Sequence, residues 1–340
     1  MLIELGNVIG HEVRPIGRVT SDLVDPATGE IFGRATVSGI EDVELAVSAA
    51  SQAWPGWRET TPRQRQELLL RFADLIEANA DEIVEAEILN TGKPAEATRT
   101  AEVLRAVDNI RFFAGALRVL PGAAQAEYAA GFTSSIRREP LGVIAQITPW
   151  NFPFMMAVWK VVPAIAAGNT VVLKPAETTP ATSVMLGRLA LEVFPPGVVN
   201  VLLGDRETGR KLVEHPRPAM VSLTGSTRAG VDVMRSAAAT LKKVHLELGG
   251  KAPAVVFADA DLEHAAQQIA EGAFWNAGQS CTAETRVLVE EAARERFTEL
   301  LVREARRLKA GPPSDPGAFC GPLITRQQFE RVSGFLDRLP

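Results

Sequence analysis

The feature that most constrains the fold is a change of pattern at Gly142, after which short apolar runs alternate with segments of helical apolar spacing. Runs that are apolar at nearly every position are typical of strands buried on both faces, as in parallel sheets covered by helices. The pattern therefore predicts an α/β fold built on a doubly wound, nucleotide-binding parallel sheet. The predicted strands are Val143 to Ile147, Thr170 to Leu173, Val198 to Leu203, Met220 to Leu223 and Val244 to Leu248, with helices near 155–167, 181–194, 206–214 and 228–240.

Helical spacing dominates the chain before this sheet, and a second α/β unit follows it. The early helices are predicted at Glu41 to Trp54, Pro62 to Ala78, Asp81 to Leu89 and Ala95 to Leu117. In the second unit, strands are predicted at Ala254 to Phe257 and Arg286 to Val289, and helices at Leu262 to Phe274 and Ala292 to Leu308. Between the early helices and the sheet, Gly131 breaks two extended-looking runs within Glu127 to Arg138. This break favours a projecting hairpin, with an ordinary surface loop as the alternative.

Composition narrows the class of partner. The 340 residues favour about two domains, and 46% hydrophobic with 23% charged residues are typical of a globular enzyme. A net charge of -5 gives no electrostatic reason to expect nucleic acid or an anionic membrane, so a small molecule is the expected partner. The most apolar window, 154–167, is interrupted by Lys160 and Pro163 and predicts a buried helix. The two cysteines form no metal-ligand or disulfide pattern, which predicts no metal site and a cytoplasmic location.

Cys281, which follows Gly278-Gln279-Ser280, is the candidate nucleophile. A thiolate attacks an aldehyde carbonyl readily, and the small residues beside it leave room for close approach of the backbone. Glu247 ends an apolar, strand-like run and could activate the water that hydrolyses a thioester. An isolated intracellular cysteine is more often structural, but the surrounding motifs favour the catalytic interpretation.

Two turns at the ends of predicted strands are candidates for cofactor binding. At Gly225-Ser226-Thr227 a strand runs into a helix, whose free backbone N-H groups and dipole can receive a pyrophosphate. Lys174 and Glu177 follow another strand and suit ribose hydroxyls. A serine helix cap and a surface ion pair are the ordinary alternatives.

Five ordered motifs resemble those of the aldehyde dehydrogenase superfamily. They are Pro149-Trp150-Asn151-Phe152-Pro153, Lys174-Pro175-Ala176-Glu177, Gly225-Ser226-Thr227, Glu247-Leu248-Gly249-Gly250-Lys251 and Gly278-Gln279-Ser280-Cys281. The resemblance extends from about Asp25 to Ile324.

The resemblance implies a role for each matched residue. Cys281 matches the thiol that forms a thiohemiacetal and, after hydride leaves to NAD(P), a thioester. Glu247 matches the general base, and Asn151 matches the side chain that holds the oxyanion together with the backbone N-H of Cys281. The implied cofactor residues are Lys174, Glu177, Gly225, Ser226, Trp150, Ile147 and Gly249, and the implied aldehyde tunnel contains Phe152, Met156 and Trp159.

The identity of the cofactor and of the aldehyde follows from finer features. A carboxylate such as Glu177 accepts a hydrogen bond from the ribose 2'-hydroxyl and repels a 2'-phosphate, which favours NAD while leaving NADP possible. The segments 108–116, 133–140 and 276–283 look most like those of aminobutyraldehyde and betaine aldehyde dehydrogenases. An ω-amino or quaternary ammonium aldehyde is therefore expected, because the aromatic side chains of Trp159 and Phe152 and the carboxylate of Asp108 would suit a cation. The alternative is that Trp159 belongs to the core and Asp108 to a solvated helix face.

The chain departs from the family at both ends. The amino end lacks the usual opening strand pattern. The apolar spacing of Phe329, Val332, Phe335, Leu336 and Leu339 predicts a last helix from about Arg326, and family members continue beyond it with a segment that contains a further cofactor-binding Glu. The expectation is a truncated chain with an exposed apolar face and an unpaired hairpin.

The predicted organisation is an NAD-binding domain at 1–118 and 141–249, an oligomerisation hairpin at 119–140 and an incomplete catalytic domain at 250–340. Full-length family members are expected to form homo-oligomers, either dimers or tetramers. Three functions stay open. They are hydrolytic aldehyde oxidation, CoA-dependent acylation, against which Glu247 argues, and a non-oxidising nucleotide-binding protein or weak thiol esterase.

Overall fold

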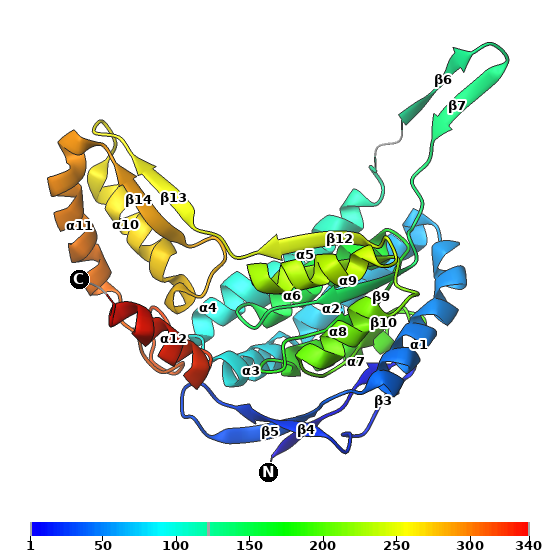
Figure 1. The fold of residues 1–340 in the computed structure, drawn as a ribbon, viewed down its shortest axis with the longest axis horizontal. Coiled ribbons are helices and arrows are strands. Elements are labelled where there is room, and N and C mark those ends of the chain that lie inside the picture. The colour runs from blue at the N-terminus through cyan, green and yellow to red at the C-terminus, as the bar shows by residue number, and fades with distance from the viewer. Residues whose placement is uncertain (1, 121–122, 339–340) are drawn as a thin grey trace.

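A seven-stranded sheet forms the centre of the molecule (Figure 1). The computed structural model describes residues 2–120 and 123–338. The sheet has the order β12-β11-β8-β9-β10-β2-β3. Its parallel strands are β8 (Val143–Ile147), β9 (Thr170–Lys174), β10 (Val199–Val201), β11 (Met220–Gly225) and β12 (Lys243–Leu248). The short antiparallel strands β2 (Val8–Ile9) and β3 (Glu12–Val13) form one edge.

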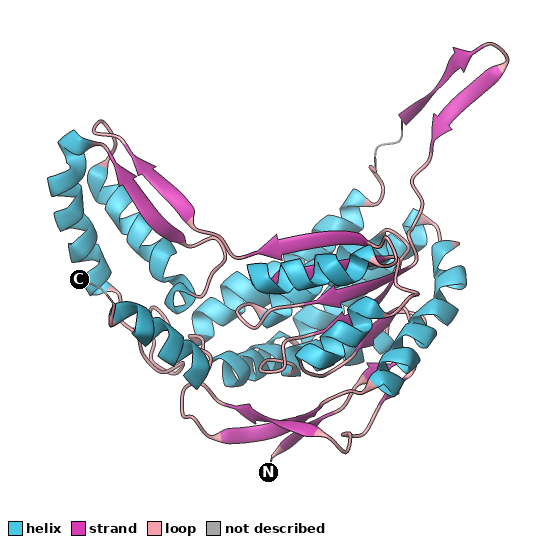
Figure 2. Ribbon diagram, viewed as in Figure 1, coloured by secondary structure: helices cyan, strands magenta, loops and turns pink. Residues whose placement is uncertain are grey.

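Helices cover both faces of this sheet, which confirms the predicted doubly wound α/β class (Figure 2). On one face α1 (Ile40–Arg58), α8 (Arg206–Glu214) and α9 (Thr227–Ala238) contribute to a common core. The other face packs α2 (Pro62–Ala78), α3 (Ala80–Thr91), α5 (Arg105–Ala116), α6 (Pro153–Ala166) and α7 (Ala181–Leu191). The apolar window around Lys160 is the buried helix α6, as predicted.

The strand order places a crevice beside the predicted cofactor residues. Successive strands run from β8 through β9 to β10 in one direction, whereas β11 and β12 lie on the other side of β8. The topological switch point therefore lies between β8 and β11, and ligands of open α/β sheets bind outside the carboxyl ends of strands at such a point. Ile147 and Gly225 are the last residues of these two strands.

Two expectations for the first third of the chain are wrong. The amino end does contain strands, because β1 (Ile3–Leu5), β5 (Ile31–Thr36) and β4 (Thr20–Val24) form a separate sheet. Only Leu23 of β4 is buried, so the apolar alternation that would reveal the strand is nearly absent. The sequence predicted a single helix from Ala95 to Leu117. The structure has three segments there: α4 (Ala95–Thr98), the π-helical segment η1 (Arg99–Leu104) and α5. Buried Glu102 lies in η1, and a π-helical turn changes which side chains face inward.

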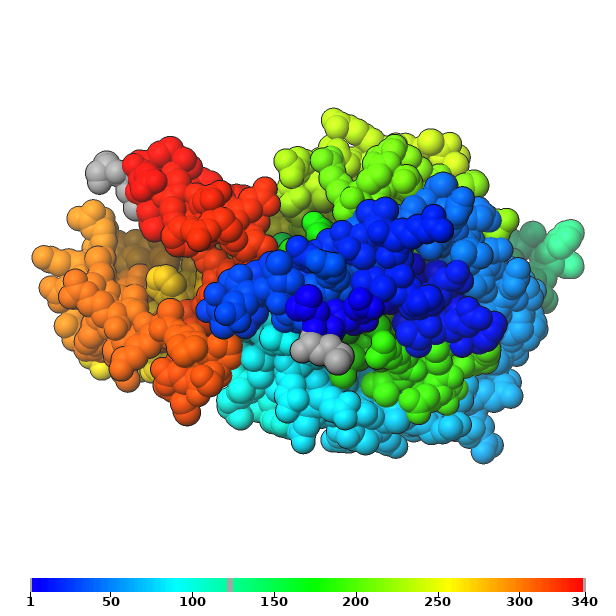
Figure 3. Space-filling model, turned by 90° about the horizontal axis from the view of Figure 1, so that it is seen from below, coloured from blue at the N-terminus to red at the C-terminus, as the bar shows by residue number. Residues whose placement is uncertain are grey.

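The second unit has its own small core. Strands β13 (Ala252–Val256) and β14 (Glu284–Val289) pair in parallel. The helices α10 (Leu262–Phe274) and α11 (Arg294–Arg307) pack around Val256, Phe297 and Leu300, and two short 3-10 turns, η2 (Trp275–Gly278) and η3 (Glu291–Ala293), complete the unit. Figure 3 shows the orange and red C-terminal segment gathered at one end of the molecule beside part of the blue N-terminal segment.

The hairpin and the last helix are present, and both expose apolar side chains. Strands β6 (Ala123–Ala129) and β7 (Phe132–Ile136) project from the body, and Gly131 has the positive φ of +82° that its turn requires (Figure 1). Within the described ranges, β6 and β7 pair only with each other. Helix α12 (Arg326–Leu336) has no buried residue, and Phe329, Phe335 and Leu336 are more than half exposed. Leu339, assigned to this helix from the sequence, and part of the 119–140 segment, at 121–122, lie outside the described residues.

Candidate active site

The loop that carries Asn151 is tied to the loop that carries Cys281. Asn151 follows β8, and its side-chain Nδ2 donates a hydrogen bond to the backbone oxygen of Gln279 at 3.0 Å. In return, Asn276 Nδ2 donates to the backbone oxygen of Asn151 at 3.1 Å. These bonds bring the predicted oxyanion donor to a position two residues before Cys281, across a large separation in sequence.

The backbone before Cys281 adopts an unusual left-handed conformation. Asn276, Ala277 and Gly278 have φ values of 52°, 58° and 74°. Left-handed backbone costs a residue with a Cβ on the order of 1 kcal/mol and persists where the surroundings hold it in place. Gln279 provides that hold, because its Nε2 donates to Asn276 O at 3.0 Å and its Oε1 accepts from the backbone N-H of Ile324 at 3.0 Å. The turn presents an exposed Cys281.

Glu247 lies near the end of β12, and the chain that follows it passes Cys281. A Cβ added to Gly250 would come 3.6 Å from the backbone oxygen of Cys281, so these two segments are in contact. The Glu247 side chain is 65% exposed, and its Oε1 lies 3.4 Å from Nε2 of His245. The carboxylate is therefore accessible to water, as a hydrolytic base must be.

A buried cluster of charged side chains binds the backbone of the Asn151 loop. Lys93 Nζ donates to Asn151 O at 3.2 Å and to Glu87 Oε1 at 3.3 Å, and it also forms an ion pair with Glu102. Burial, followed by repulsion from Glu87, raises the pKa of Glu102 well above 4.5, while Lys93 opposes this rise. Thr182 Oγ1 donates to the remaining oxygen of Glu87 at 2.7 Å.

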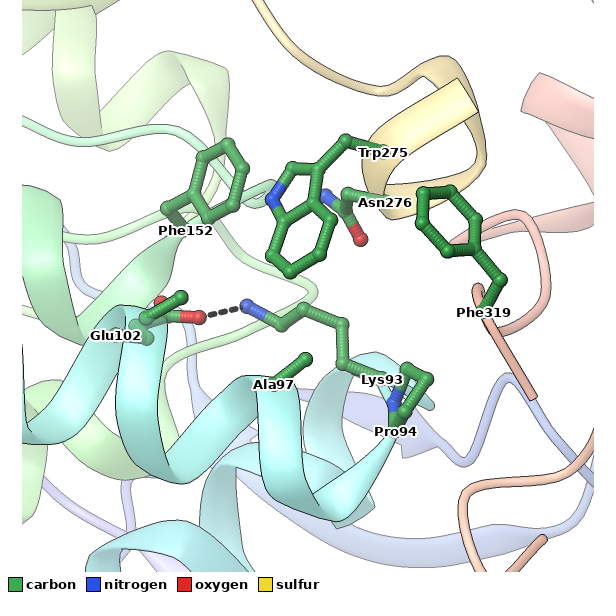
Figure 4. Close-up of a pocket in the computed structure, with 9 residues that line it drawn as sticks. Lys93, Pro94, Ala97, Glu102, Phe152, Trp275, Asn276 and Phe319 are labelled. Atoms are coloured by element: carbon green, nitrogen blue, oxygen red, sulfur yellow. Dashed lines mark hydrogen bonds and ion pairs between the residues drawn. The ribbon is translucent and has the colours of Figure 1, made fainter. Parts of the chain in front are cut away.

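A small cavity lies beside this cluster (Figure 4). Lys93 points between Glu102 and the rings of Phe152 and Trp275, and its Nζ lies 5.2 Å from the centroid of the Phe152 ring. The volume of about 20 Å³ leaves room for about one water molecule. Phe152 is the only one of the four predicted substrate residues that lines this cavity. Met156 is partly buried on α6, Trp159 on the same helix is 46% exposed, and Asp108 is exposed on α5.

The predicted cofactor residues surround the switch point of the sheet. Ser226 caps α9, and its Oγ accepts from the backbone N-H of Ala229 at 3.2 Å. Gly225 directly precedes this cap, and Ile147 and Trp150 lie at the end of β8 and in the loop after it. Gly249 is exposed after β12, and its backbone N-H donates to Gly225 O. A helix N-terminus beside a glycine turn is suited to a pyrophosphate.

Lys174 and Glu177 occupy the carboxyl end of β9. Lys174 Nζ donates to Pro175 O at 2.8 Å and to Gly204 O at 2.7 Å, and it lies 4.0 Å from Glu177 Oε2. Burial lowers the pKa of Lys174 to about 8, and Glu177 and then Asp205 oppose the shift. An ammonium has three donors, so these two carbonyls leave one N-H for a ligand hydroxyl.

Several residues of this site were given no role of their own from the sequence, although Gln279 and Asn276 lie within matched segments. Lys93, Gln279 and Asn276 act through distant contacts that only the folded chain reveals. Lys160 was visible only as an interruption of an apolar window. No helix in the described ranges is both long and apolar enough to span a membrane. Across the same ranges, no cluster of three or more His, Cys, Asp or Glu side chains is placed to hold a metal.

Comparison with known proteins identifies the family of the chain. The model of the aldehyde dehydrogenase family matches residues 16–339. The chain belongs to the aldehyde dehydrogenase family. A mitochondrial aldehyde dehydrogenase from Leishmania tarentolae is 40% identical over 96% of this chain and 66% of its own length. A 2-aminomuconic semialdehyde dehydrogenase from Bos taurus is 39% identical over 99% of this chain and 69% of its own length.

Solved structures of the family agree with the fold. The crystal structure of an NAD-dependent aldehyde dehydrogenase from Sinorhizobium meliloti superposes with a TM-score of 0.95 at 37% identity. That match covers 98% of this chain and 68% of the other. This chain therefore spans about two thirds of the length of these aldehyde dehydrogenases.

Proposed function

We propose that this aldehyde dehydrogenase oxidises an aldehyde to the carboxylic acid with NAD, through a covalent intermediate on Cys281. The observation that carries the proposal is the hydrogen bond from Asn151 Nδ2 to Gln279 O, because it holds an amide donor beside the nucleophile loop. A donor fixed in advance where negative charge develops is the largest single contribution in many acyl-transfer sites.

Each catalytic residue has one step in this proposal. The Cys281 thiolate forms a C-S bond with the aldehyde carbon, and the oxyanion is held by Asn151 Nδ2 and the backbone N-H of Cys281. Loss of hydride converts the thiohemiacetal to a thioester. Glu247 then takes a proton from water, whose oxygen bonds to the acyl carbon while the C-S bond breaks and the Cys281 thiolate is restored.

The residues around the switch point fit a dinucleotide. The Ser226 turn would hold the pyrophosphate, Lys174 and Glu177 the adenosine ribose, and Ile147, Trp150 and Gly249 would line the crevice. When bound, NAD accepts the hydride that leaves the thiohemiacetal. Glu177 supports NAD over NADP, because its side chain is half exposed at the strand end where a 2'-phosphate would meet its charge.

For the substrate we propose an ω-amino or quaternary ammonium aldehyde. Exposed aromatic faces attract cations, and Trp159 offers such a face on α6. Phe152 already faces the Lys93 ammonium, so we assign the substrate cation to Trp159, with Asp108 as a more distant carboxylate. Met156 would contribute to the apolar wall between them.

We also propose the domain roles inferred from the sequence. Residues 1–118 and 141–249 would bind NAD, and 250–340 would belong to the catalytic domain. The hairpin within 119–140 would join copies of the chain in a homo-oligomer, because it projects from the body with Tyr128, Phe132 and Ile136 highly exposed. A cytoplasmic location remains a prediction, since the Leishmania relative is named as mitochondrial.

One assay of the purified chain separates the open functions. NADH formation is followed with aminobutyraldehyde, with and without CoA, and ester hydrolysis is measured in parallel. NADH formation that does not need CoA supports the hydrolytic enzyme. A requirement for CoA would favour the acylating relative, and ester hydrolysis without NADH formation would favour a thiol esterase.

A further inference from the structure

On one face of the sheet, a series of side chains extends from the interior of the protein to Glu247. Strands β11 and β12 pair in parallel with Ser222 opposite His245 and Thr224 opposite Glu247. Alternate residues of a strand share a face, so His245 and Glu247 lie on the same face of β12. Helix α6 covers this face and brings Lys160 to Ser222.

The contacts on this face form an unbroken series. Lys160 Nζ donates to Ser222 Oγ at 2.8 Å, and Ser222 Oγ lies 3.0 Å from His245 Nδ1. On the other side of the imidazole, Nε2 lies 3.4 Å from Glu247 Oε1. Lys160 and Ser222 are buried, whereas His245 and Glu247 are more than half exposed. A buried cation is thus linked to an exposed carboxylate through two side chains.

The chemistry of the donors fixes the direction of the first bond and favours one direction for the second. An ammonium only donates, so Ser222 Oγ accepts from Lys160 and its own hydroxyl proton is free to donate. A second proton donor at this oxygen would also meet the positive charge of Lys160, so we infer that the hydroxyl donates to Nδ1 of His245, which is then unprotonated. A neutral imidazole with an acceptor at Nδ1 carries its proton on Nε2, the nitrogen that faces Glu247.

We propose that His245 is a positioning residue for Glu247, with its Nε2-H tautomer set by Lys160 through Ser222. The Nε2-H group orients the carboxylate that takes a proton from water. The proposal rests on the proposed role of Glu247 in hydrolysis. Lys243 lies two residues before His245, on the same face of β12.

The tautomer can be measured without turnover. NMR of the 340-residue chain labelled with 15N-histidine distinguishes the two tautomers at about pH 7.5, where most unperturbed imidazoles are neutral. His245 is expected to hold the Nε2-H form, and Ser222→Ala should shift it towards a mixture of tautomers. Lys160→Met should do the same, because an Oγ that no longer binds the ammonium can accept from Nδ1 as readily as it donates to it. Ser222→Ala keeps the buried lysine, so it decides the question if Lys160→Met fails to fold.

His215 provides an internal control. Its Nδ1 accepts from the backbone N-H of Arg217 at 3.2 Å, and its Nε2 lies 2.9 Å from Glu44 Oε2. His215 therefore has an acceptor role at Nδ1 and a carboxylate beside Nε2, as proposed for His245, but it contacts neither Ser222 nor Lys160. The tautomer of His215 should not change in either variant. A His245 tautomer that stays fixed in Ser222→Ala, or that is mixed in the unmodified chain, would overturn the proposal.

A chemical readout tests the link to Glu247. Cys281 is acylated with p-nitrophenyl acetate, and decay of the acyl-protein is followed by intact mass. His245→Ala is expected to slow this decay about tenfold with little effect on acylation, and His245→Gln, which retains a donor, should restore part of the rate. Equal loss of acylation and decay in His245→Ala would contradict a positioning role. Failure of Cys281 to acylate would instead refute the proposed function, while the NMR result would still decide the tautomer.

Discussion

Replacing Lys174 by Met should change how stability depends on pH. The Lys174 ammonium is buried at the end of β9, and burial lowers its pKa from 10.5 to about 8. Between these two values the unfolded chain binds a proton that the folded chain has released. Stability therefore rises with pH across this window, and the cost of the buried charge is fully present below about pH 8.

The expected magnitude follows from the pKa difference. A shift of one unit corresponds to about 1.4 kcal/mol, so the lowered pKa of Lys174 amounts to about 3 kcal/mol over the whole window. Between about pH 7 and pH 9.5, roughly 2 kcal/mol of that cost should be relieved in the unmodified chain. Lys174→Met removes the titrating group. The difference in unfolding free energy between the two proteins should therefore shift by about 2 kcal/mol in favour of the unmodified chain.

Urea unfolding at a series of pH values, without NAD, measures this difference. Burial also lowers the pKa of Lys160 to about 8, but Lys160 is present in both proteins and its contribution cancels. Lys309→Met, which removes an exposed lysine, is the matched control and should give a difference that is flat with pH. A flat difference for Lys174→Met as well would refute the assignment of a buried, titrating ammonium.

Three further predictions concern the site itself. Cys281→Ala should abolish aldehyde oxidation and ester hydrolysis but leave NAD binding, measured by calorimetry, nearly unchanged, whereas Cys320→Ala should retain activity; turnover in the Cys281 variant would end the covalent proposal. Glu247→Gln should give a burst of NADH with little steady turnover in stopped-flow measurements, and an equal loss of both phases would place Glu247 earlier in the reaction. Lys93→Met leaves buried carboxylates without their cation and should lower stability to urea by about 3–5 kcal/mol, a loss that Lys93→Met combined with Glu102→Leu should partly reverse.

The sequence predicted the central sheet because buried parallel strands are apolar at nearly every position. β8 and β12 were located with errors of at most one residue at their ends. The same criterion missed β4, where a single buried Leu23 gives no period. It also could not foresee η1, because the π-helical turn occurs where Glu102 is drawn into an ion pair with Lys93. A local pattern reports local burial, whereas these features depend on partners far along the chain.

In the candidate site, too, local motifs could be read from the sequence, whereas contacts between distant residues could not. Cys281 and Asn151 were proposed from the small residues and ordered motifs that surround them. The geometry that joins them depends on Gln279, whose side chain holds both the left-handed turn and the segment around Ile324. A glutamine between a glycine and a serine has many possible roles, and only the folded chain selects one.

Three buried lysines contact the three parts of the candidate site, which are the Asn151 loop, the Glu247 strand and the cofactor residues after β9. Lys93 holds the backbone of Asn151, Lys160 reaches Glu247 through Ser222 and His245, and Lys174 binds two carbonyls at the cofactor end of β9. Burying an ammonium opposes folding, so none of the three is explained by stability alone. Each one donates hydrogen bonds whose directions are fixed by the core. Each therefore holds in place a group to which we assign a role in the proposed reaction. Lysine at these positions is thus better explained by orientation of the site than by the energetics of the fold.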